Sequence, residues 1–418
     1  MHTPELVYEY TSIQVYKYTS IRVDHLHSFL CLRRQTIGLR TEIRTLPPAF
    51  CQTILETLMA DTSKRLRIAV LFGGRSAEHE VSVLSATNIL RALEPAKYDA
   101  VPIFVTREGQ WLLSSFEGGT LAKPSSGTEV CLVPGGQGRM MAIPIHGAPH
   151  ELPDIDILFP ALHGLHGEDG SVQGLAEVAR VPLAGCGILG SAAALDKDIA
   201  KRLLNEAGLP TARSVTIHHG AAPAFAELQS ALGLPLFIKP ARQGSSVGVS
   251  KVSAEAEKDY QATLTEGFRH DRKLLAEEFI RGREIECSVL ENTDGGLFVS
   301  RPGEIVPAQS HGFYSYDAKY IDEHGAALKV PAELPQEIEG KIREMAAKAF
   351  RAVGCDGMAR VDFFVTPDMR VLINELNTIP GFTDISMYSK AMAASGVSYC
   401  EIIDRLVAHG LARAGRSA

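Results

Sequence analysis

The chain has 418 residues, of which 45% are apolar and 22% are charged, with a net charge of −7 at pH 7; this suits a globular protein of two or three domains. The negative charge, without a run of Lys or Arg, argues against a nucleic-acid or anionic-membrane partner, and no apolar run reaches the roughly 20 residues that span a bilayer. Seven scattered cysteines without a Cys-x-x-Cys pair exclude a zinc ribbon and argue against a disulfide framework, so we expect a cytoplasmic protein.

The N-terminal segment, positions 1–58, differs in character from the rest of the chain. Residues 7–14 (VYEYTSIQ) are nearly duplicated at residues 15–22 (VYKYTSIR), and no charged segment followed by an apolar core marks a secretory signal. We expect residues 1–58 to be an upstream extension without a fold of its own, with the natural start at Met59. The alternatives are an organellar transit peptide over Arg33–Arg44 and a hairpin of the two repeats, which would be only marginally stable in water.

Residues 59–187 show the pattern of an α/β domain. A short apolar strand runs into Gly73-Gly74 and a helix follows, which is the opening of an α/β unit. Gly185–Gly190 matches the Gly-x-Gly-x-x-Gly dinucleotide pattern, but no acidic residue ends a second strand about 20 residues later, so we interpret it as a turn between domains. The predicted elements are a strand at 66–72, a helix at 82–93, a strand at 100–106, an irregular Gly- and Pro-rich stretch at 108–153, and strands at 155–162 and 181–184.

Two further domains are predicted, at residues 188–276 and 277–418. A helix rich in Ala, Lys and Leu opens the first of them at 192–207, and Gly208 and Pro210 end it. The other predicted elements are strands at 235–240, 274–279, 284–290, 359–366 and 370–377, and a closing helix at 399–412.

The last two predicted strands form a hairpin with an acidic face, separated by a Pro-Asp turn. Because side chains alternate along a strand, Glu375 and Asn377 point the same way, and the partner strand can bring Asp362 beside them. Two carboxylates and an amide are ligands that Mg²⁺ accepts when it also holds phosphate oxygens. Without a cation the two carboxylates would repel each other. The hairpin therefore predicts a metal site that serves a nucleotide.

A loop of small residues, Gly244–Gly248, follows Lys239 at the end of an apolar strand. Its backbone N–H groups can converge on an anion, so the lysine and the loop together predict a lid over a triphosphate. A plain surface turn is the alternative. The chain contains no Walker A pattern, so it is not a P-loop nucleotidase.

Six segments of the chain resemble the D-alanine–D-alanine ligases, members of the ATP-grasp superfamily, from about Arg65 to Leu411. They are FGGRSAEHEVS (72–82), HGLHGEDG (163–170), ALDK (194–197), KPARQGSSVG (239–248), FYSYDAKY (313–320) and the stretch 360–387. The resemblance implies an α/β (α+β) chain with an N-terminal pre-ATP-grasp domain. A two-lobed ATP-grasp fold follows and holds ATP between two antiparallel sheets. It also implies an ADP-forming ligase that joins two D-alanines through a D-alanyl phosphate for peptidoglycan precursors.

The resemblance assigns catalytic roles by matching position. Glu80 is expected to bind the ammonium of the first D-alanine, and Ser245 to link Glu80 with Tyr320. Arg360 is expected to face the transferred phosphoryl group and to form the oxyanion site with the Gly381 N–H. Charge that develops on a transferred phosphoryl group requires cations, which supports the role of Arg360 independently.

The resemblance also assigns binding residues. The residues expected to bind the two D-alanines and the phosphoryl group are His163, Lys319, Ser386 and the backbone N–H of Met387. Those expected at the nucleotide are Lys197, Lys239 and Ser246, with Glu277 at the adenine and Glu284 at the ribose. Those expected to hold two Mg²⁺ ions, with Mn²⁺ as a possible replacement, are Asp362, Glu375 and Asn377.

Two other functions compete with this hypothesis. Another ATP-dependent carboxylate–amine ligase, or a variant that forms a depsipeptide, would share most of these residues; the Tyr320 loop favours the dipeptide product. A non-catalytic nucleotide-binding relative would have lost metal ligands or phosphate-facing cations, and none is lost here. The aromatic segment Phe313–Tyr320 is expected to be a lid that keeps water from an acylphosphate, with an ordinary exposed loop as the alternative. A homodimer is expected from the resemblance.

Overall fold

The computed structural model describes residues 65–253, 257–307 and 326–415 of this chain. All of them belong to one unit, Lys64–Ala418. The expected extension over residues 1–58 and the expected lid at 313–320 lie outside the described residues. Within the described ranges, no helix is both long enough and apolar enough to cross a membrane.

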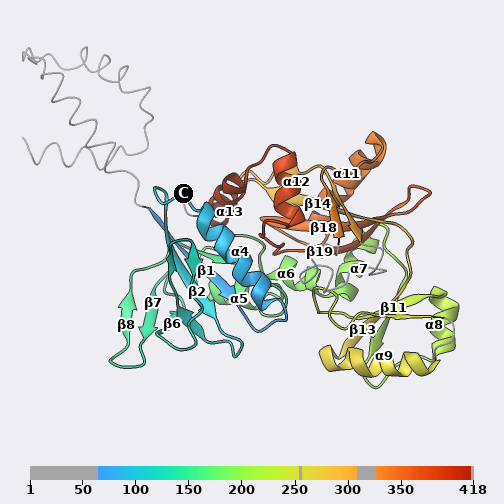
Figure 1. Ribbon diagram of the computed structural model, residues 1–418, viewed down its shortest axis with the longest axis horizontal. Coiled ribbons are helices and arrows are strands. Elements are labelled where there is room, and N and C mark those ends of the chain that lie inside the picture. The colour runs from blue at the N-terminus through green and yellow to red at the C-terminus, as the bar shows by residue number, and fades with distance from the viewer. Residues whose placement is uncertain (1–64, 254–256, 308–325, 416–418) are drawn as a thin grey trace, which may run out of the picture. The chain divides into compact units, whose positions relative to one another are not determined.

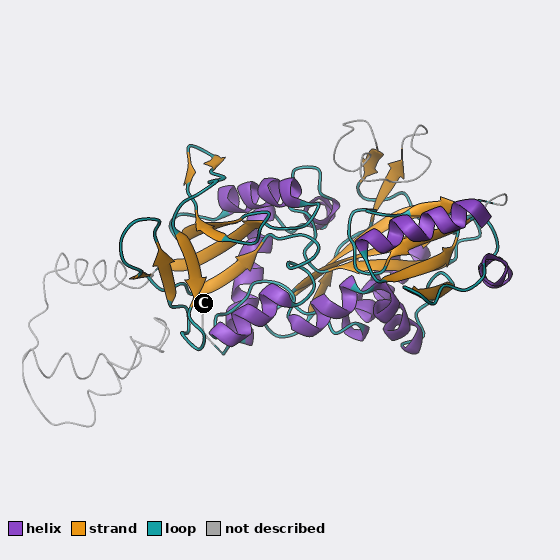
Figure 2. Cartoon of the chain, turned by 90° about the horizontal axis from the view of Figure 1, so that it is seen from below, coloured by secondary structure: helices purple, strands orange, loops and turns teal. Residues whose placement is uncertain are grey.

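The first domain is built on a seven-stranded sheet in the order β8-β7-β6-β3-β2-β1-β9 (Figure 1). Apolar runs predicted its three parallel strands, which are β2 (Tyr98–Val105), β1 (Leu66–Gly73) and β9 (Ile157–Pro160). These strands are largely buried because helices cover both faces of the sheet, as is typical of parallel strands (Figure 2). α4 (His79–Ala92) and α13 (Tyr399–Arg413) lie on one face, and α5 (Ser171–Ala179) lies on the other. The last helix of the chain therefore completes the first domain.

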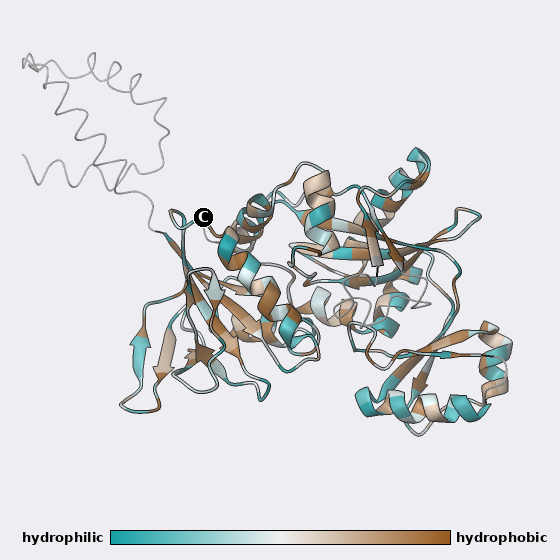
Figure 3. Ribbon diagram, viewed as in Figure 1, coloured by the Kyte–Doolittle hydropathy of each residue, from teal (hydrophilic) through white to brown (hydrophobic). Residues whose placement is uncertain are grey.

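The stretch 108–153, predicted to be irregular, instead extends this sheet. Its antiparallel strands are β3 (Trp111–Leu113), β6 (Glu129–Leu132), β7 (Met140–Ile143) and β8 (His150–Leu152), beside a small pair, β4 (Phe116–Glu117) and β5 (Thr120–Leu121). The prediction was wrong because each strand is short and buries only alternate residues, such as Val130 and Leu132. In the composition of this stretch, the Gly and Pro residues of the connecting loops outweigh the few buried strand residues. The outermost strand, β8, is exposed and hydrophilic at its start (Figure 3).

The single helix predicted at 192–207 is two helices, α6 (Ile188–Leu195) and α7 (Lys197–Glu206). They are separated by Asp196, whose backbone is extended and whose carboxylate accepts a hydrogen bond from the Ile199 N–H at 3.2 Å. Aspartate is a favoured N-cap because its side chain satisfies a free N–H of the first turn. This break puts Lys197 at the beginning of α7.

The central lobe is a four-stranded antiparallel sheet in the order β10-β13-β11-β12. Its strands are β10 (Ser214–His218), β13 (Lys273–Glu278), β11 (Leu236–Pro240) and β12 (Ser250–Val252). Two helices, α8 (Phe225–Leu232) and α9 (Glu257–His270), bury their apolar sides in one cluster with these strands. The opposite face carries the predicted Lys239 and Glu277. The domain boundary expected at residue 277 falls inside β13.

The C-terminal lobe contains a second sheet, in the order β17-β16-β14-β18-β19 with β15 added on β14. Its strands are β17 (Ala326–Lys329), β16 (Gly303–Pro307), β14 (Arg283–Glu291), β18 (Met358–Val365), β19 (Val371–Asn377) and β15 (Leu297–Val299). α11 (Gln336–Ala352) covers one face, against which alternate β14 residues such as Ile285 and Cys287 are buried. The opposite face therefore carries the alternating acidic residues Glu284 and Glu286. α12 (Met387–Ala394) follows the last strand.

The predicted hairpin of β18 and β19 is confirmed, with Asp362 beside Glu375. Asp362 lies opposite Glu375, and Arg360 lies opposite Asn377. The pairing shifts by one residue between Asp362 and Phe363. This β-bulge, rather than regular alternation alone, puts Asp362 and Glu375 side by side on one face of the sheet.

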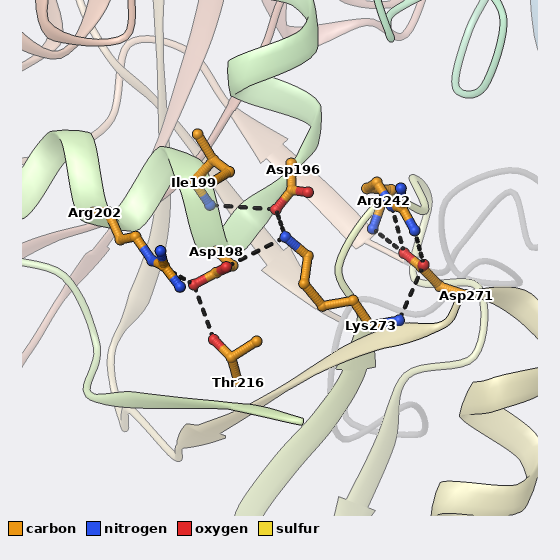
Figure 4. A network of polar contacts seen from close by, with 8 residues as sticks. All are labelled: Asp196, Asp198, Ile199, Arg202, Thr216, Arg242, Asp271 and Lys273. Carbon is orange, nitrogen blue, oxygen red and sulfur yellow. Dashed lines mark hydrogen bonds and ion pairs between the residues drawn. The ribbon is translucent and has the colours of Figure 1, made fainter. Parts of the chain in front are cut away.

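A buried polar network joins α7 to the central sheet (Figure 4). The ammonium of Lys273 on β13 lies 2.6 Å from Asp196 Oδ1 and 3.2 Å from Asp198 Oδ2. Asp198 also accepts a hydrogen bond from Thr216 Oγ1 at 2.9 Å. Burial alone would raise the pKa of Asp198, but the hydrogen bonds from Thr216 and Lys273 lower it below its usual value. Lys273 thus connects Asp196, at the helix break, and Asp198, in the first turn of α7, to the central sheet.

Replacing Lys273 with Met is expected to lower the free energy of unfolding by about 3 kcal/mol, because a buried and a partly buried carboxylate, Asp198 and Asp196, lose their shared cation. Urea unfolding followed by circular dichroism measures the change. The matched control is Lys97→Met, which removes an exposed lysine paired with Glu94 and Asp404. Exposed ion pairs contribute little, so the control should unfold at nearly the parental midpoint. Equal midpoints for both variants would contradict a structural role for Lys273.

Candidate active site

Two adjoining cavities contain most of the predicted site residues. The larger of the two lies between the central and C-terminal sheets and has a volume of about 440 Å³. This is within the range of about 300–1,000 Å³ that is typical of small-molecule sites. The predicted residues in its lining are Lys197, Lys239, Ser245, Ser246, Glu277, Glu284 and Glu375. Phe237 and Phe279 add two aromatic side chains whose ring centroids are 5.9 Å apart.

Lys239 and Glu277 form a buried ion pair in this cavity. Lys239 Nζ lies 2.6 Å from Glu277 Oε2, and both side chains are at most 10% exposed. Burial alone would lower the pKa of Lys239, but the neighbouring carboxylates of Glu277 and Glu375 raise it. Burial would likewise raise the pKa of Glu277, but Lys239 and Lys201 lower it. Both groups are therefore charged at neutral pH, and the cavity presents a fixed cation and a fixed carboxylate.

Sequence reasoning missed Lys201, the second cation on Glu277. Its Nζ lies 2.8 Å from Glu277 Oε1 and donates a hydrogen bond to the Ala212 carbonyl at 3.0 Å. Lys201 follows Lys197 by four residues, so the two lie on the same side of α7. That spacing was the available signal, although it is also common on solvent-exposed helices.

The loop predicted to cover phosphates lies along the same cavity. Ser245 and Ser246 have positive φ values of 49° and 59°, a left-handed conformation that is uncommon for residues other than glycine. Successive residues in such turns expose their N–H groups on one side and can hold an anion. Lys197 Nζ donates to the Gln243 carbonyl at 2.8 Å and lies 3.3 Å from Glu375 Oε2. Lys197 thereby joins the loop to the C-terminal hairpin.

The smaller cavity, of about 110 Å³, adjoins this loop and reaches the first domain. It brings together residues that are far apart in the sequence. Its predicted lining residues are His163, Lys197, Ser245, Arg360, Glu375, Asn377, Gly381, Ser386 and Met387. Three carboxylates that were not predicted, Glu78, Glu168 and Glu286, also line it.

The predicted contact between Ser245 and Glu80 is wrong, because Ser245 Oγ donates its hydrogen bond to Glu78 instead. The Glu80 side chain is 61% exposed and pairs with Lys123 and Arg107 on the surface. Glu78 is only 9% exposed. The difference arises because α4 begins at residue 79 rather than at 82, which puts position 80 on the outer side of its first turn. Glu78 immediately precedes the helix and points into the smaller cavity.

His163 is buried between the first domain and the C-terminal lobe. Its Nδ1 lies 2.9 Å from the Ile379 carbonyl oxygen, and its Nε2 lies 3.0 Å from Ser85 Oγ. Burial lowers the pKa of His163, so the imidazole is neutral at pH 7. A neutral imidazole held at both nitrogens is suited to positioning its neighbours rather than to neutralising a carboxylate.

Glu168 joins the same two parts of the chain. Its carboxylate accepts hydrogen bonds from the Gly164 N–H at 2.7 Å and from the Ile379 N–H at 3.0 Å. Burial and the nearby Glu78 raise the pKa of Glu168 to about 8, although the two backbone donors act in the opposite direction. The protonated form is therefore favoured in the folded protein at neutral pH.

Replacing Glu168 with Gln is expected to change the dependence of stability on pH. A folded-state pKa raised from 4.5 to about 8 means that the folded protein binds the proton more tightly than the unfolded chain. The contribution of Glu168 is therefore complete below about pH 4.5, falls by about 1.4 kcal/mol per pH unit as the pH rises, and is lost above pH 8. The unfolding free energy of the parent minus that of the variant, measured from pH 5 to pH 9, should decrease as the pH rises to 8 and then stay constant. A constant difference would contradict the raised pKa.

The C-terminal hairpin presents Glu375 to both cavities and Arg360 and Asn377 to the smaller one, whereas Asp362 lines neither. Arg360 donates two hydrogen bonds to Asp362, both of 2.7 Å. Asn377 Oδ1 is buried and accepts no hydrogen bond from the described residues. A buried acceptor without a partner is costly, and it is the type of oxygen that a hard cation binds. Within the part of the chain that the structure describes, no three His, Cys, Asp or Glu side chains converge as a metal site. Asp362 lies opposite Glu375, and their carboxylates with Asn377 Oδ1 are hard oxygen ligands that suit a divalent cation which also takes oxygens from a bound phosphate.

The end of the smaller cavity is formed by the turn after β19 and by the start of α12. Ser386 Oγ accepts a hydrogen bond from the Thr383 N–H at 2.9 Å, and Met387 is the first residue of the helix. The N-terminus of a helix favours a negatively charged group such as a carboxylate. A Cβ at Gly381 would lie 2.8 Å from Ser386 Oγ, so a larger residue there would displace the Ser386 hydroxyl. The remaining predicted residues, Lys319 and Tyr320, lie outside the described residues.

Two antiparallel sheets that enclose a cavity lined by buried lysines, beside a carboxylate-bearing hairpin, define an ATP-grasp enzyme. The family models agree with this class. "D-ala D-ala ligase N-terminus" matches residues 67–186, and "D-ala D-ala ligase C-terminus" matches residues 203–408. The chain therefore belongs to the D-alanine–D-alanine ligase family, and the fold class and the family expected from the sequence are confirmed.

Similar proteins support the same assignment. The D-alanine–D-alanine ligase A of Brucella suis biovar 1 (strain 1330) is 72% identical over 351 residues, which cover 84% of this chain and 99% of that protein. The ligase A of Mesorhizobium japonicum is 56% identical over 357 residues, which cover 84% of this chain and 98% of that protein. Among solved structures, the D-alanine–D-alanine ligase of Coxiella burnetii has a TM-score of 0.73 at 34% identity, and the match covers 84% of this chain and 96% of that one. The VanG D-Ala:D-Ser ligase of Enterococcus faecalis has a TM-score of 0.71 at 35% identity, and the match covers 83% of this chain and 100% of that one.

Proposed function

We infer that this chain ligates two molecules of D-alanine, with ATP as the phosphoryl donor, to give D-alanyl-D-alanine for peptidoglycan precursors, ADP and phosphate. One observation carries the inference: the larger and the smaller cavity meet along a shared wall. The residues that line both are Lys197, Ser245, Ile305 and Glu375. A nucleotide in the larger cavity would thus direct its terminal phosphate at an amino acid in the smaller one.

The first step is phosphorylation of the carboxylate of the first D-alanine. One carboxylate oxygen attacks the terminal phosphorus of ATP, the bond to the leaving oxygen breaks, and ADP departs. Lys197 and Lys239 hold the phosphates, and Arg360 stabilises the charge that develops on the transferred group. Bound at Asp362, Glu375 and Asn377, Mg²⁺ would neutralise phosphate charge. Glu78, rather than Glu80, would hold the ammonium of this D-alanine, because it is the carboxylate within the smaller cavity.

The second step is attack by the amine of the second D-alanine on the acylphosphate. The tetrahedral oxyanion would accept hydrogen bonds from the Gly381 N–H and from Arg360. Ser386 and the Met387 N–H, at the start of α12, would hold the carboxylate of the second D-alanine. Attack forms the C–N bond, collapse of the intermediate breaks the bond between the acyl carbon and the phosphate oxygen, and the phosphate takes up the proton that the nitrogen loses. Glu277 at the adenine, Glu284 at the ribose and the loop serine Ser246 would complete the nucleotide site.

Further properties are proposed with this activity. We propose that two Mg²⁺ ions serve the reaction, with Mn²⁺ as a replacement, and that the protein acts in the cytoplasm as a homodimer. Lys319 is proposed to act on the transferred phosphoryl group, and Tyr320 to favour an amine as the second substrate.

The test is phosphate release by the full chain with ATP and Mg²⁺. We expect release that requires D-alanine, does not occur with L-alanine, and yields D-alanyl-D-alanine by mass spectrometry. Parallel reactions pair D-alanine with D-serine or with D-lactate and identify the second substrate from the product. A folded protein that binds ATP but releases no phosphate in response to D-alanine would contradict the proposed function.

A further inference from the structure

Glu286 is a third carboxylate on the sheet face that carries the predicted metal ligands. It lies on β14 directly opposite Asp362 of β18, which in turn lies opposite Glu375 of β19. The three carboxylates thus form one row across three neighbouring strands. Glu286 is 7% exposed and lines the smaller cavity. It follows Glu284 by two residues, so both point to the same face of the sheet.

The position of Glu286 does not suit a third carboxylate ligand of a metal ion. Within the described ranges, no three acidic, His or Cys side chains converge on one point, so the row does not form a three-carboxylate site. Glu286 is paired instead with Arg360, which lies two residues before Asp362 on β18. Arg360 Nε is 2.9 Å from Glu286 Oε2. The interaction of Glu286 is therefore with Arg360 rather than with a metal.

Arg360 Nε lies between two carboxylates. It donates to Asp362 Oδ1 at 2.7 Å while Glu286 Oε2 is 2.9 Å away. The Nε–H carries a single hydrogen, so the two carboxylates share or compete for it. Arg360 Nη2 also donates to Asp362, at 2.7 Å, which leaves both oxygens of Asp362 engaged with the arginine. An oxygen that accepts from Arg360 has less capacity to bind a cation.

We propose that Glu286 is a positioning residue that holds Arg360 and thereby leaves Asp362 available to the metal. When the Nε–H is directed to Glu286, Asp362 can use an oxygen for a cation without leaving the guanidinium unpaired. Arg360 then stays on the cavity wall, where it faces the transferred group and the oxyanion. This inference rests on the proposed function for the role of Arg360, but the contact of Glu286 with Arg360 is independent of the substrate.

The consequence can be measured as metal affinity. Glu286→Gln keeps the size of the side chain but removes the charge that competes for Arg360. Arg360 is then held more firmly by Asp362, so the affinity for Mn²⁺ should fall about 5- to 20-fold in the presence of a non-hydrolysable ATP analogue. Free Mn²⁺ is measured by electron paramagnetic resonance of the full chain, without turnover. In the assay, kcat should fall at least 10-fold while the KM for ATP changes less than 3-fold.

The matched control is Glu291→Gln. Glu291 lies on the same strand, is 6% exposed and pairs with Arg351 at 2.6 Å, but it lines neither cavity. It reports the general effect of neutralising a buried carboxylate that holds an arginine. We expect the control to keep parental Mn²⁺ affinity and parental kcat at a temperature where both variants are folded.

Three results would overturn the proposal. One is a Glu286→Gln variant with Mn²⁺ affinity and kcat both within twofold of the parent. Another is a loss of kcat with unchanged Mn²⁺ affinity, since Glu286 would then not act on Asp362. The third is an equal loss of both quantities in Glu291→Gln, which would show a general structural effect. If Glu286→Gln does not fold, Glu286→Asp, which retracts the charge from Nε, should lower Mn²⁺ affinity at least 3-fold, and a smaller change would refute the proposal.

The proposed function can fail separately. A parent that binds Mn²⁺ with the ATP analogue but forms no dipeptide would contradict the ligase activity. The Mn²⁺ comparison between parent and Glu286→Gln would still decide whether Glu286 frees Asp362 for the metal.

Discussion

Replacing Asp362 with Asn is expected to lower kcat by about 100- to 1,000-fold, the effect of removing one electrostatic stabiliser of a transition state. The substitution leaves an oxygen that can accept from Arg360 but removes the charge proposed to bind the metal. Asn377 Oδ1 and the Glu375 carboxylate would remain, with a weaker attraction for a divalent cation. Phosphate release as a function of Mg²⁺ concentration measures the effect. The apparent Mg²⁺ requirement should rise as kcat falls.

Asp368→Asn provides a control from the same hairpin. Asp368 lies in the turn between β18 and β19, where it pairs with Arg370, and the side chains of Arg370 and Asp368 are 69% and 64% exposed. Its removal should leave kcat within twofold of the parent, because exposed pairs contribute little and the turn lies outside both cavities. Similar losses in Asp362→Asn and Asp368→Asn would indicate damage to the hairpin rather than loss of a metal ligand.

Replacing Glu78 with Gln is expected to raise the KM for D-alanine about 100-fold, which corresponds to ~3 kcal/mol for a desolvated charge pair. Glu78 accepts the hydrogen bond of Ser245 and lies beside Gly244, where an added Cβ would come within 2.7 Å of Glu78 Oε2. A neutral amide there would no longer attract the ammonium of the first D-alanine. It would also weaken the contact that joins the first domain to the phosphate loop. Phosphate release measured against D-alanine concentration gives the KM.

The neighbouring Glu80→Gln variant distinguishes this role from a general effect of charge. Glu80 is two positions away on the exposed side of α4, and among the described residues its ion pairs are with Lys123 and Arg107. Its KM for D-alanine should stay within twofold of the parent. A large rise for Glu80→Gln, with no change for Glu78→Gln, would restore the assignment made from the sequence. Equal effects would point to the summed negative charge of this segment.

Local sequence patterns predicted the two strands of the C-terminal hairpin. Alternation along the second strand put Glu375 and Asn377 on one face, with Asp362 expected beside them. The register that achieves this was not predicted: with Phe363 opposite Ile373, regular pairing would put Asn374 opposite Asp362, and only the β-bulge between Asp362 and Phe363 brings Glu375 there. The strands that carry Lys239 and Glu277 were predicted from their apolar runs.

Other features could not be predicted because they depend on contacts between distant segments. Nothing near Glu168 indicates that its carboxylate accepts from the Ile379 N–H, which belongs to a remote part of the sequence. Burial at that junction, rather than residue type, raises the pKa of Glu168. The pairing of Arg360 with Glu286 likewise requires β14 and β18 to be neighbours, although they are far apart along the chain.

The family, the two strands of the C-terminal hairpin and the residue types at the site follow from the sequence alone, because short motifs and the two-residue period of strands are enough to predict them. Tertiary structure decided which carboxylate enters the smaller cavity, Glu78 or Glu80. The start of α4 puts Glu80 on the outer side of the helix, and the Ser245 loop of the central lobe approaches Glu78. The physical reason is that helix and strand periodicity is local, whereas burial, ion pairing and the sharing of Arg360 arise only when remote strands pack together.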